Sequence, residues 1–199
     1  MAMDETFRLI LALILVTAVG ISGYHRRRAQ RTSGAIARRQ EAPRLIALRL
    51  AFGLPLLFSL LAFLVRPGLV TWARAPIPVS IRWIGVAIGV MSVPLVVWVM
   101  KSIGPNISET VLTKREHILV THGPYRWVRH PLYVTGLLLL ISATLIASNW
   151  LIGTLTVVAA IAIRYIVIPT EEAALLEKFG DHYREYMMHA GRLLPNLRA

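Results

Sequence analysis

Five blocks of apolar residues, each close to 20 residues long, constrain the fold of this 199-residue chain more than any other feature. A helix needs about 20 predominantly apolar residues to cross a bilayer core, and its backbone polar groups must be paired within the segment. The blocks therefore predict an all-α integral membrane protein with five transmembrane helices. They are Thr6–Gly23, Leu45–Val65, Ser80–Met100, Leu132–Ser148 and Trp150–Ile168.

The distribution of basic residues predicts how these helices are oriented. Seven arginines lie in the 24–44 loop, five Lys or Arg in 101–131 and four in the 169–199 tail, against two in the 66–79 loop. Lys and Arg accumulate on the cytoplasmic side of a membrane, so we expect an N-terminus outside and a cytoplasmic C-terminus. We interpret the first block as a retained helix rather than a signal peptide, because HRRRAQR follows it without an A-x-A cleavage site.

Composition limits the classes of partner and of chemistry. The formal net charge of +12, in a chain with 56% hydrophobic residues, favours anionic lipid headgroups at the 24–44 loop over nucleic acid. The same arginines also serve as topology signals without any ligand. The absence of cysteine excludes disulfides, thiolate metal sites and cysteine nucleophiles. The six histidines form no HExxH-like pair, and no metal site is predicted.

The last two apolar blocks are joined almost directly, through Asn149. We therefore expect a tight antiparallel helical hairpin over residues 132–168. This hairpin returns the 117–133 segment, HILVTHGPYRWVRHPLY, to the membrane face that holds Glu171 and Glu172. Two polar clusters that are distant in sequence thereby become neighbours.

Further residues predict how the helices pack and end. After Pro169, apolar residues at helical spacing indicate a cytosolic amphipathic helix, broken near Gly180, that lies on the membrane surface, covers the site as a lid, or does both. Gly85 and Gly89 form a GxxxG step that permits close approach of another helix. Arg82, near the end of its apolar block, is expected to extend its charged end toward water.

The turn before the fourth helix, together with the acid pair, indicates a ligand site. Gly123–Pro124 is typical of a turn, and Pro131 suits the first turn of a helix, whose N–H groups favour an anionic group. Tyr125, Trp127 and Tyr133 offer aromatic faces to a purine ring or a cation. Each residue alone also fits an aromatic belt, a topology signal or a first-turn acid. The ordered combination is what indicates function.

The ordered segments HILVTHGPYRWVRHPLYVTG, EEAALLEKFGDHYREY and RLLP resemble the isoprenylcysteine carboxyl methyltransferase family, whose relatives include phospholipid N-methyltransferases. The likeness covers roughly residues 101–197 and includes the GPYxxxRHPxY and FGxxYxxY patterns. With the hydropathy pattern, it implies two regions. Residues 1–100 form a lipid-facing helical scaffold, and residues 101–199 form a catalytic region that binds S-adenosylmethionine.

The resemblance also implies individual roles, with a lipophilic substrate that enters from the bilayer. The cofactor-binding residues would be His117, Ile118, Leu119, Val120, Tyr125, His130, Pro131, Leu132, Tyr133 and Glu171, and the catalytic ones Arg164, Glu171 and Glu172. Family members commonly carry an Arg four residues before the acid pair, where this chain has Val167. Arg164, about one turn earlier, either orients a substrate carboxylate in its place or pairs with one of the two acids as a structural residue.

The predicted activity is methyl transfer from S-adenosylmethionine to a lipid-like or prenylated acceptor in the membrane, with carboxyl O-methylation favoured. A carboxylate acceptor needs only an orienting cation such as Arg164, whereas an amine or thiol needs a base, for which Glu172 or His130 is the candidate. Two alternatives remain at this point. One is a nicotinamide-dependent membrane lipid or sterol-type reductase, which has a similar RHP motif. The other is a non-enzymatic polybasic protein that acts through the 24–44 loop.

Overall fold

The computed structural model describes residues 2–33, 43–106 and 118–196, and the regular structure of these residues is helical. The long helices are α1 (Ala2–Ser33), α2 (Pro43–Val65), α3 (Val79–Ile103), α4 (Pro131–Ala147), α5 (Trp150–Ala162), α6 (Ile168–Phe179) and α7 (Asp181–His189). Short 3-10 helices span Pro67–Ala73, Gly104–Asn106 and Gly123–Arg126, and a π-helix spans Ile163–Val167. The expected all-α class is confirmed.

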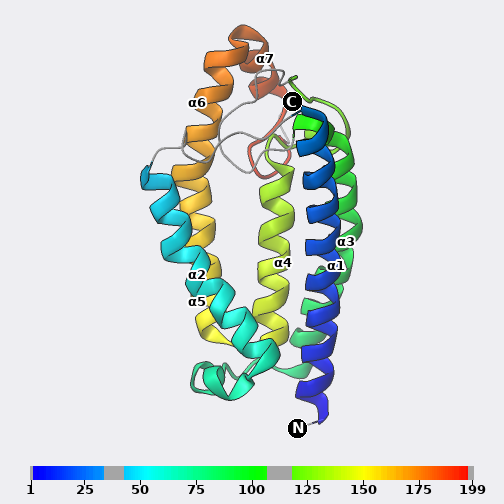
Figure 1. Cartoon of the computed structure of the whole chain (residues 1–199), viewed down its shortest axis with the longest axis vertical. Coiled ribbons are helices and arrows are strands. Elements are labelled where there is room, and N and C mark those ends of the chain that lie inside the picture. The colour runs from blue at the N-terminus through cyan, green and yellow to red at the C-terminus, as the bar shows by residue number, and fades with distance from the viewer. Residues whose placement is uncertain (1, 34–42, 107–117, 197–199) are drawn as a thin grey trace.

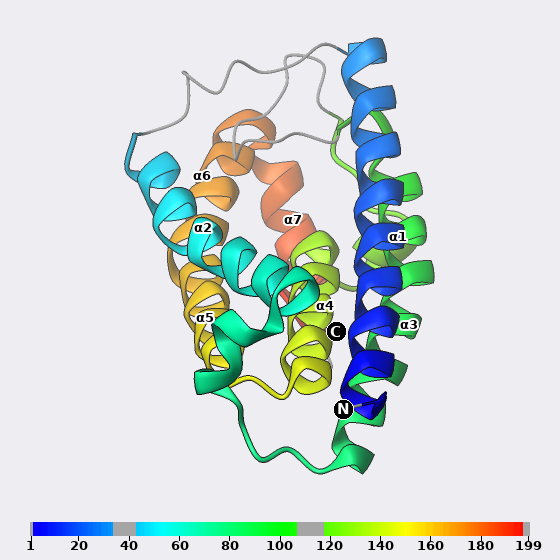
Figure 2. The ribbon, with the colours of Figure 1, turned by 60° about the horizontal axis from the view of Figure 1, so that its bottom comes forward.

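The helices form an elongated bundle with α4 near its middle. Figures 1 and 2 show α1 and α3 on one side of α4 and α2 and α5 on the other, and direct contacts join α3 to α4 and α4 to α5. The start of α1 lies at one end of the bundle, and α6 and α7 lie at the opposite end (Figure 1). The orientation of the termini across a membrane remains a prediction.

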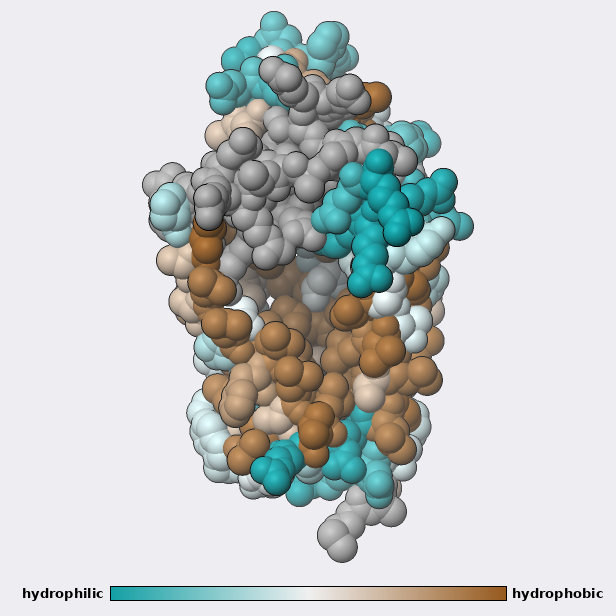
Figure 3. All heavy atoms as spheres, in the orientation of Figure 1, coloured by the Kyte–Doolittle hydropathy of each residue, from teal (hydrophilic) through white to brown (hydrophobic). Residues whose placement is uncertain are grey.

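The apolar surface agrees with a membrane protein. Among the described residues, four helical segments are long and apolar enough to cross a bilayer: Met3–Arg31, Ile46–Val65, Val79–Ile103 and Trp150–Phe179. The fifth predicted span corresponds to α4, which is apolar but has 17 residues, so the count of five remains a prediction. Figure 3 shows a broad hydrophobic zone at mid-height with hydrophilic residues toward both ends.

The predicted GxxxG contact is confirmed and fixes α4 against α3. A Cβ added at Gly85 would lie 2.7 Å from Leu145 Cβ, and one added at Gly89 would lie 2.5 Å from Ser142 Oγ. The Ser142 hydroxyl donates to the Gly85 carbonyl over 2.7 Å. The two backbones therefore approach more closely than any side chain larger than hydrogen allows. This contact holds α4, and with it the turn that precedes α4.

The predicted helical hairpin is also confirmed. After α4 ends at Ala147, Ser148 adopts a left-handed conformation with φ 50°, and α5 begins at Trp150. The side chain of Asn149 caps α5 by accepting a hydrogen bond from Ile152 N over 3.1 Å. Asparagine is a preferred residue at this capping position because its short side chain pairs an N–H group that the helix leaves free.

The helical run from α5 differs from the sequence prediction. The sequence predicted a span that ends at Ile168 and a separate helix after Pro169, but α5, the π-helix and α6 follow one another without a break. Proline lacks an N–H group and crowds the carbonyl four residues before it, which disturbs a regular α-helix. The π-helical segment Ile163–Val167 ends two residues before Pro169 and widens the helix there. The predicted interruption at Gly180 is confirmed, with φ 55° between α6 and α7.

The expectation that Arg82 extends toward water was wrong. Arg82 is 5% exposed and donates from Nη1 to Asp4 Oδ1 over 2.6 Å and from Nε to the Ile146 carbonyl over 3.0 Å. Its guanidinium carbon also lies 4.0 Å from the centroid of the Phe7 ring. A partner 78 residues away in sequence therefore keeps this charge inside the bundle. The contact joins α1, α3 and α4 at the end opposite α6 and α7.

Candidate functional site

The segment before α4 folds as its turn residues predict. Gly123 has φ 61°, in the left-handed region that glycine adopts most easily, and begins the 3-10 helix Gly123–Arg126. His130 is the N-cap of α4 and Pro131 is its first residue. Proline suits this position because a helix does not use the N–H group of its first residue. The turn and the helix start thereby place His130 and Tyr133 beside α6.

Glu172 lies at the centre of a buried group of charged side chains. It is 4% exposed, and both of its carboxylate oxygens have partners. Oε1 accepts a hydrogen bond from Arg129 Nε over 2.9 Å and lies 3.3 Å from His130 Nε2. Oε2 lies 2.6 Å from Arg192 Nη2. Three side chains, from the turn before α4 and from the tail, therefore contact the Glu172 carboxylate of α6. A buried charge needs such partners, because burial removes its contacts with water.

Glu171 occupies a more open position in the same group. Its side chain is 29% exposed, and Oε2 accepts a hydrogen bond from the Tyr133 hydroxyl over 2.9 Å. The same oxygen lies 3.8 Å from His130 Nδ1. His130 therefore stands between the two acids, with one ring nitrogen facing each. The structure thus brings together His130, Tyr133, Glu171 and Glu172, as the sequence predicted.

Arg129 connects this group to the end of α7. Besides Glu172, its guanidinium donates from Nη1 to the carbonyl of Met187 over 3.2 Å and to the carbonyl of Ala190. These carbonyls lie in and just after the last turn of α7, where the helix leaves acceptors without internal partners and where its dipole favours a cation. Arg129 was not among the predicted site residues, although it is the first residue of the RHP motif.

The tail after α7 pairs with the turn through the backbone. Gly191 N donates to the Trp127 carbonyl over 3.0 Å, Arg129 N to the Gly191 carbonyl over 2.8 Å, and His130 N to the Arg192 carbonyl over 3.2 Å. The two N–H groups directly before Pro131 therefore bind the tail. An anion at this helix start would depend on the N–H groups of the first turn of α4 itself. The RLLP segment is the sequence signal for this tail, but no residue of the segment was among the predicted site residues.

The structure also describes Tyr125, Pro131 and Leu132, three further predicted cofactor residues. Tyr125 is buried, its carbonyl accepts a 2.6 Å hydrogen bond from the Tyr186 hydroxyl, and burial together with the charge of Glu171 raises the pKa of its own hydroxyl. Pro131 is buried, and Leu132 packs on a cluster that includes Met100.

The apolar run at 118–120 is joined to the 3-10 helix Gly104–Asn106, which follows α3. Asn106 accepts from Ile118 N over 3.1 Å and donates to the Ile118 carbonyl over 2.9 Å. The Ile118 side chain is exposed, and those of Leu119 and Val120 are half-buried. His117 lies outside the described residues.

Arg164 and Val167 occupy different surroundings on the same helical run. Arg164 is exposed, with its guanidinium carbon 5.2 Å from the Tyr165 ring centroid, and within the described part of the chain it pairs with neither Glu171 nor Glu172. The structural pairing proposed as one alternative is therefore not observed. Val167 is buried and packs against Tyr133. The position of the family arginine thus faces the site, and this chain fills it with an apolar side chain.

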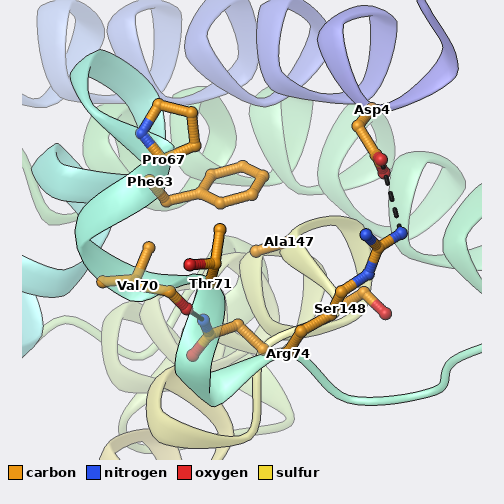
Figure 4. Close-up of a pocket in the computed structure, with 9 residues that line it drawn as sticks. Asp4, Phe63, Pro67, Val70, Thr71, Arg74, Ala147 and Ser148 are labelled. Carbon is orange, nitrogen blue, oxygen red and sulfur yellow. Dashed lines mark hydrogen bonds and ion pairs between the residues drawn. The ribbon is translucent and has the colours of Figure 1, made fainter. Parts of the chain in front are cut away.

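A pocket lies at the opposite end of the bundle and is a poor candidate for a ligand site. It encloses about 110 Å³ and is lined partly by Asp4, Arg74, Thr71, Ser148 and Asn149 (Figure 4). Its polar side chains already have partners within the chain. Asp4 pairs with Arg74 over 3.3 Å, and the other three donate to backbone carbonyls over 2.7 to 3.1 Å. Each of these polar side chains already has a partner within the chain, and we therefore take the charged group at the hairpin mouth as the candidate site.

An all-helical membrane bundle with a buried Arg–His–Glu group at the mouth of a helical hairpin defines a class of integral membrane protein with a polar site at the membrane boundary. Residues 83–177 match the model of the isoprenylcysteine carboxyl methyltransferase family. This region, which includes α4, α5 and both acids, is therefore similar to that family.

Individual relatives show the same similarity over part of their length. The protein-S-isoprenylcysteine O-methyltransferase of Tribolium castaneum is 31% identical over 121 residues, which cover 58% of this chain and 43% of the relative. The methanethiol S-methyltransferase of Pseudomonas deceptionensis is 43% identical over 76 residues, covering 37% of this chain and 27% of the relative. The match therefore spans less than half the length of either curated relative.

A solved structure supports the fold. The structure of the eukaryotic intramembrane Ras methyltransferase ICMT has a TM-score of 0.55 to this chain at 19% sequence identity. The superposition covers 94% of this chain and 67% of that chain. The helices outside the matched family region therefore also follow the fold of this membrane protein.

Proposed function

We propose that this chain is a membrane methyltransferase that transfers the methyl group of S-adenosylmethionine to a lipid-like or prenylated acceptor in the bilayer. The observation that carries the proposal is the meeting of His130, Tyr133, Glu171 and Glu172 at the mouth of the hairpin, within the family-matched region. The relatives named above are an isoprenylcysteine O-methyltransferase and a methanethiol S-methyltransferase, which support methyl transfer as the reaction class.

The side chains present fit such a methyl donor. The donor carries a cationic amine, a cationic sulfonium, ribose hydroxyls and an aromatic base. Glu171, half-buried and hydrogen-bonded to Tyr133, is suited to an amine or a hydroxyl, and the Tyr133 ring offers a face to a cation. When bound, S-adenosylmethionine supplies a methyl group that its positively charged sulfur has already activated. The protein then has to align the acceptor and exclude water.

The two acids have different surroundings and, we infer, different roles. Glu172 is buried with both oxygens occupied by Arg129, His130 and Arg192. It is therefore suited to hold the turn, the helix start and the tail in place. Glu171 is open enough to contact a ligand. We therefore assign Glu172 as a positioning residue. From the sequence alone, it was a candidate general base.

The geometry favours a carboxylate as the acceptor. An amine or a thiol must lose a proton before it attacks, and a general base needs a free acceptor position. His130 directs both ring nitrogens at carboxylates, and Glu172 has both oxygens engaged, so neither is arranged as that base. A carboxylate attacks without losing a proton. Arg164, exposed within the π-helical segment Ile163–Val167, is the candidate that orients the carboxylate.

The surface is consistent with an acceptor that arrives from the bilayer. The molecular face in Figure 3 is hollowed within its hydrophobic zone. Arg164 lies one turn before Val167, which packs on Tyr133 beside the acids. A lipophilic acceptor whose polar end lies at the level of Arg164 would bring its carboxylate toward the hairpin mouth.

The test is methyl transfer by the purified protein in detergent or nanodiscs, with S-adenosylmethionine carrying a labelled methyl group. We expect label on a prenylated cysteine with a free carboxylate and none on the same compound supplied as its methyl ester. Failure to bind either S-adenosylmethionine or its demethylated product would contradict the proposal. Oxidation of a reduced nicotinamide with lipid saturation, and no methyl transfer, would favour a reductase instead.

A further inference from the structure

Tyr183, on α7, has a hydroxyl group whose surroundings are unusual. The side chain is 1% exposed, and its hydroxyl is the buried side-chain polar atom that has no hydrogen-bond partner within the described residues. Buried polar groups in folded proteins are nearly always paired, because an unpaired one loses its bonds to water and gains nothing in return. Tyr186, one turn further along α7, follows this rule by donating to the Tyr125 carbonyl over 2.6 Å.

The location of Tyr183 connects it to the candidate site. Its ring centroid lies 5.9 Å from that of Tyr186. Burial raises the pKa of the Tyr183 hydroxyl, and the nearby charge of Glu172 raises it further. The hydroxyl therefore stays protonated and can donate a hydrogen bond at neutral pH. Its helix is fixed to the site by Arg129, which binds the carbonyls of Met187 and Ala190.

We propose that the Tyr183 hydroxyl is a hydrogen-bond contact for the bound methyl donor, a role that rests on the proposed function and extends the site from α4 and α6 to α7. The donor is preferred over the lipophilic acceptor because Tyr183 lies on α7, after the end of the apolar span Trp150–Phe179. The carboxylate, ribose oxygens and adenine nitrogens of S-adenosylmethionine all accept a hydrogen bond from a neutral tyrosine.

This role gives the hydroxyl opposite effects on the two states of the protein. In the ligand-free protein it is buried without a partner, and its removal relieves that loss. In the complex it forms a bond, and its removal leaves a ligand atom unpaired. Because the hydroxyl is enclosed, ligand entry has to displace the side chains around it. Gly180, with φ 55°, is the joint at which α7 turns away from α6.

The experiment compares Tyr183→Phe with Tyr186→Phe in the full-length purified protein. Both changes remove one buried tyrosine hydroxyl from α7, but only the Tyr186 hydroxyl has a partner inside the chain. Thermal unfolding is measured without ligand, and S-adenosylhomocysteine binding is measured by calorimetry. We expect Tyr183→Phe to keep or raise the ligand-free Tm while it weakens binding by roughly 5- to 20-fold. Tyr186→Phe should lower the Tm and weaken binding less than Tyr183→Phe.

Two results would overturn the assignment of Tyr183. Binding within twofold of wild type would show that the hydroxyl does not contact the ligand. A ligand-free Tm that falls as far as it does for Tyr186→Phe would show that the hydroxyl has a structural partner. These results are distinct from failure of the proposed function. If the proposed function is wrong, the wild-type protein itself will bind neither S-adenosylmethionine nor S-adenosylhomocysteine. The role of Tyr183 would then be rejected together with the proposed function.

Discussion

Each end of the helical bundle buries an arginine against an acid, but the two pairs are built differently. At the end that holds the start of α1, Arg82 binds Asp4 and the Ile146 carbonyl, and the polar side chains of the adjacent pocket have internal partners. At the other end, Arg129, His130 and Arg192 all contact Glu172. The partly exposed Glu171 and the hydroxyl of Tyr183, which has no partner within the described residues, lie nearby.

We interpret the Arg82–Asp4 pair as a purely structural contact and the Glu172 group as a contact that also supports a ligand site. A buried ion pair gives little net stability over a well-packed apolar pair, although loss of one partner is costly. The Arg82–Asp4 pair joins three helices, α1, α3 and α4. The Glu172 group joins three segments and leaves Glu171 directed at the hairpin mouth. The contrast predicts that the first end controls stability alone and that the second controls stability and ligand binding together.

The largest effect is expected from Glu172→Ala. This change leaves the buried Arg129 guanidinium without its carboxylate and releases the tail at Arg192. We expect the free energy of unfolding to fall by about 3–5 kcal/mol, the usual cost of a buried charge that loses its partner. Denaturant unfolding of the purified protein measures the change, and binding of S-adenosylhomocysteine should be lost in parallel. Wild-type stability would show that the carboxylate does not organise this group.

A smaller effect on stability alone is expected from Arg82→Met at the opposite end. The methionine keeps much of the apolar volume, and the carboxylate that loses its partner, Asp4, has a side chain 43% exposed to solvent. We expect a loss of about 1–3 kcal/mol in the free energy of unfolding, because removal of one ionic partner is tolerated better near solvent. The dissociation constant for S-adenosylhomocysteine should stay within twofold of wild type. A specific loss of binding would break the comparison between the two ends.

Glu171→Gln is expected to weaken ligand binding without a loss of stability, the reverse of Arg82→Met. Its side chain is partly exposed, and Gln retains an acceptor for the Tyr133 hydroxyl, so the unfolding midpoint should change little. Removal of the negative charge should weaken S-adenosylmethionine binding by about tenfold, which corresponds to about 1.4 kcal/mol. Calorimetry on the folded variant measures this effect. Unchanged affinity would remove Glu171 from the ligand site.

The smallest effect compares two arginines near the C-terminus. Arg192 contacts the buried Glu172 over 2.6 Å, whereas Arg184 pairs with Asp181 on the exposed face of α7. Arg192→Ala should lower the free energy of unfolding by about 1 kcal/mol and raise the KM for S-adenosylmethionine, with partial recovery in Arg192→Lys. Arg184→Ala is the matched control and should behave as wild type, as most exposed ion pairs do. Equal effects of both changes would contradict a specific role for the tail.

Features set by local sequence were predicted correctly. The apolar blocks predicted helices, and Asn149 predicted a tight hairpin. Gly85 and Gly89 predicted a close helix contact, and the structure shows that the partner is α4. The Gly180 interruption followed from the same kind of signal. Because the hairpin is short and antiparallel, its geometry alone brought the turn before α4 to the acid pair. This is why much of the candidate site could be predicted without coordinates.

The features that were missed depend on contacts between distant segments. Arg82 was assigned to water because Asp4 is 78 residues away and nothing near Arg82 in sequence identifies its partner. The role of Arg192 depends on how the tail pairs with the turn at Trp127. The continuation of α5 into α6 depends on a π-helical segment before Pro169, which has no simple sequence signature.

The central claim is that the methyl donor binds at the mouth of the hairpin, between α4 and α6, and it can be tested by locating the ligand directly. Ultraviolet crosslinking of S-adenosylmethionine with a labelled methyl group, followed by peptide mapping, identifies the segments in contact. We expect label that S-adenosylhomocysteine displaces, on peptides within residues 118–133 and 164–192. Displaceable label on the peptides around Asp4, Thr71 or Asn149, or none that S-adenosylhomocysteine displaces, would contradict this account.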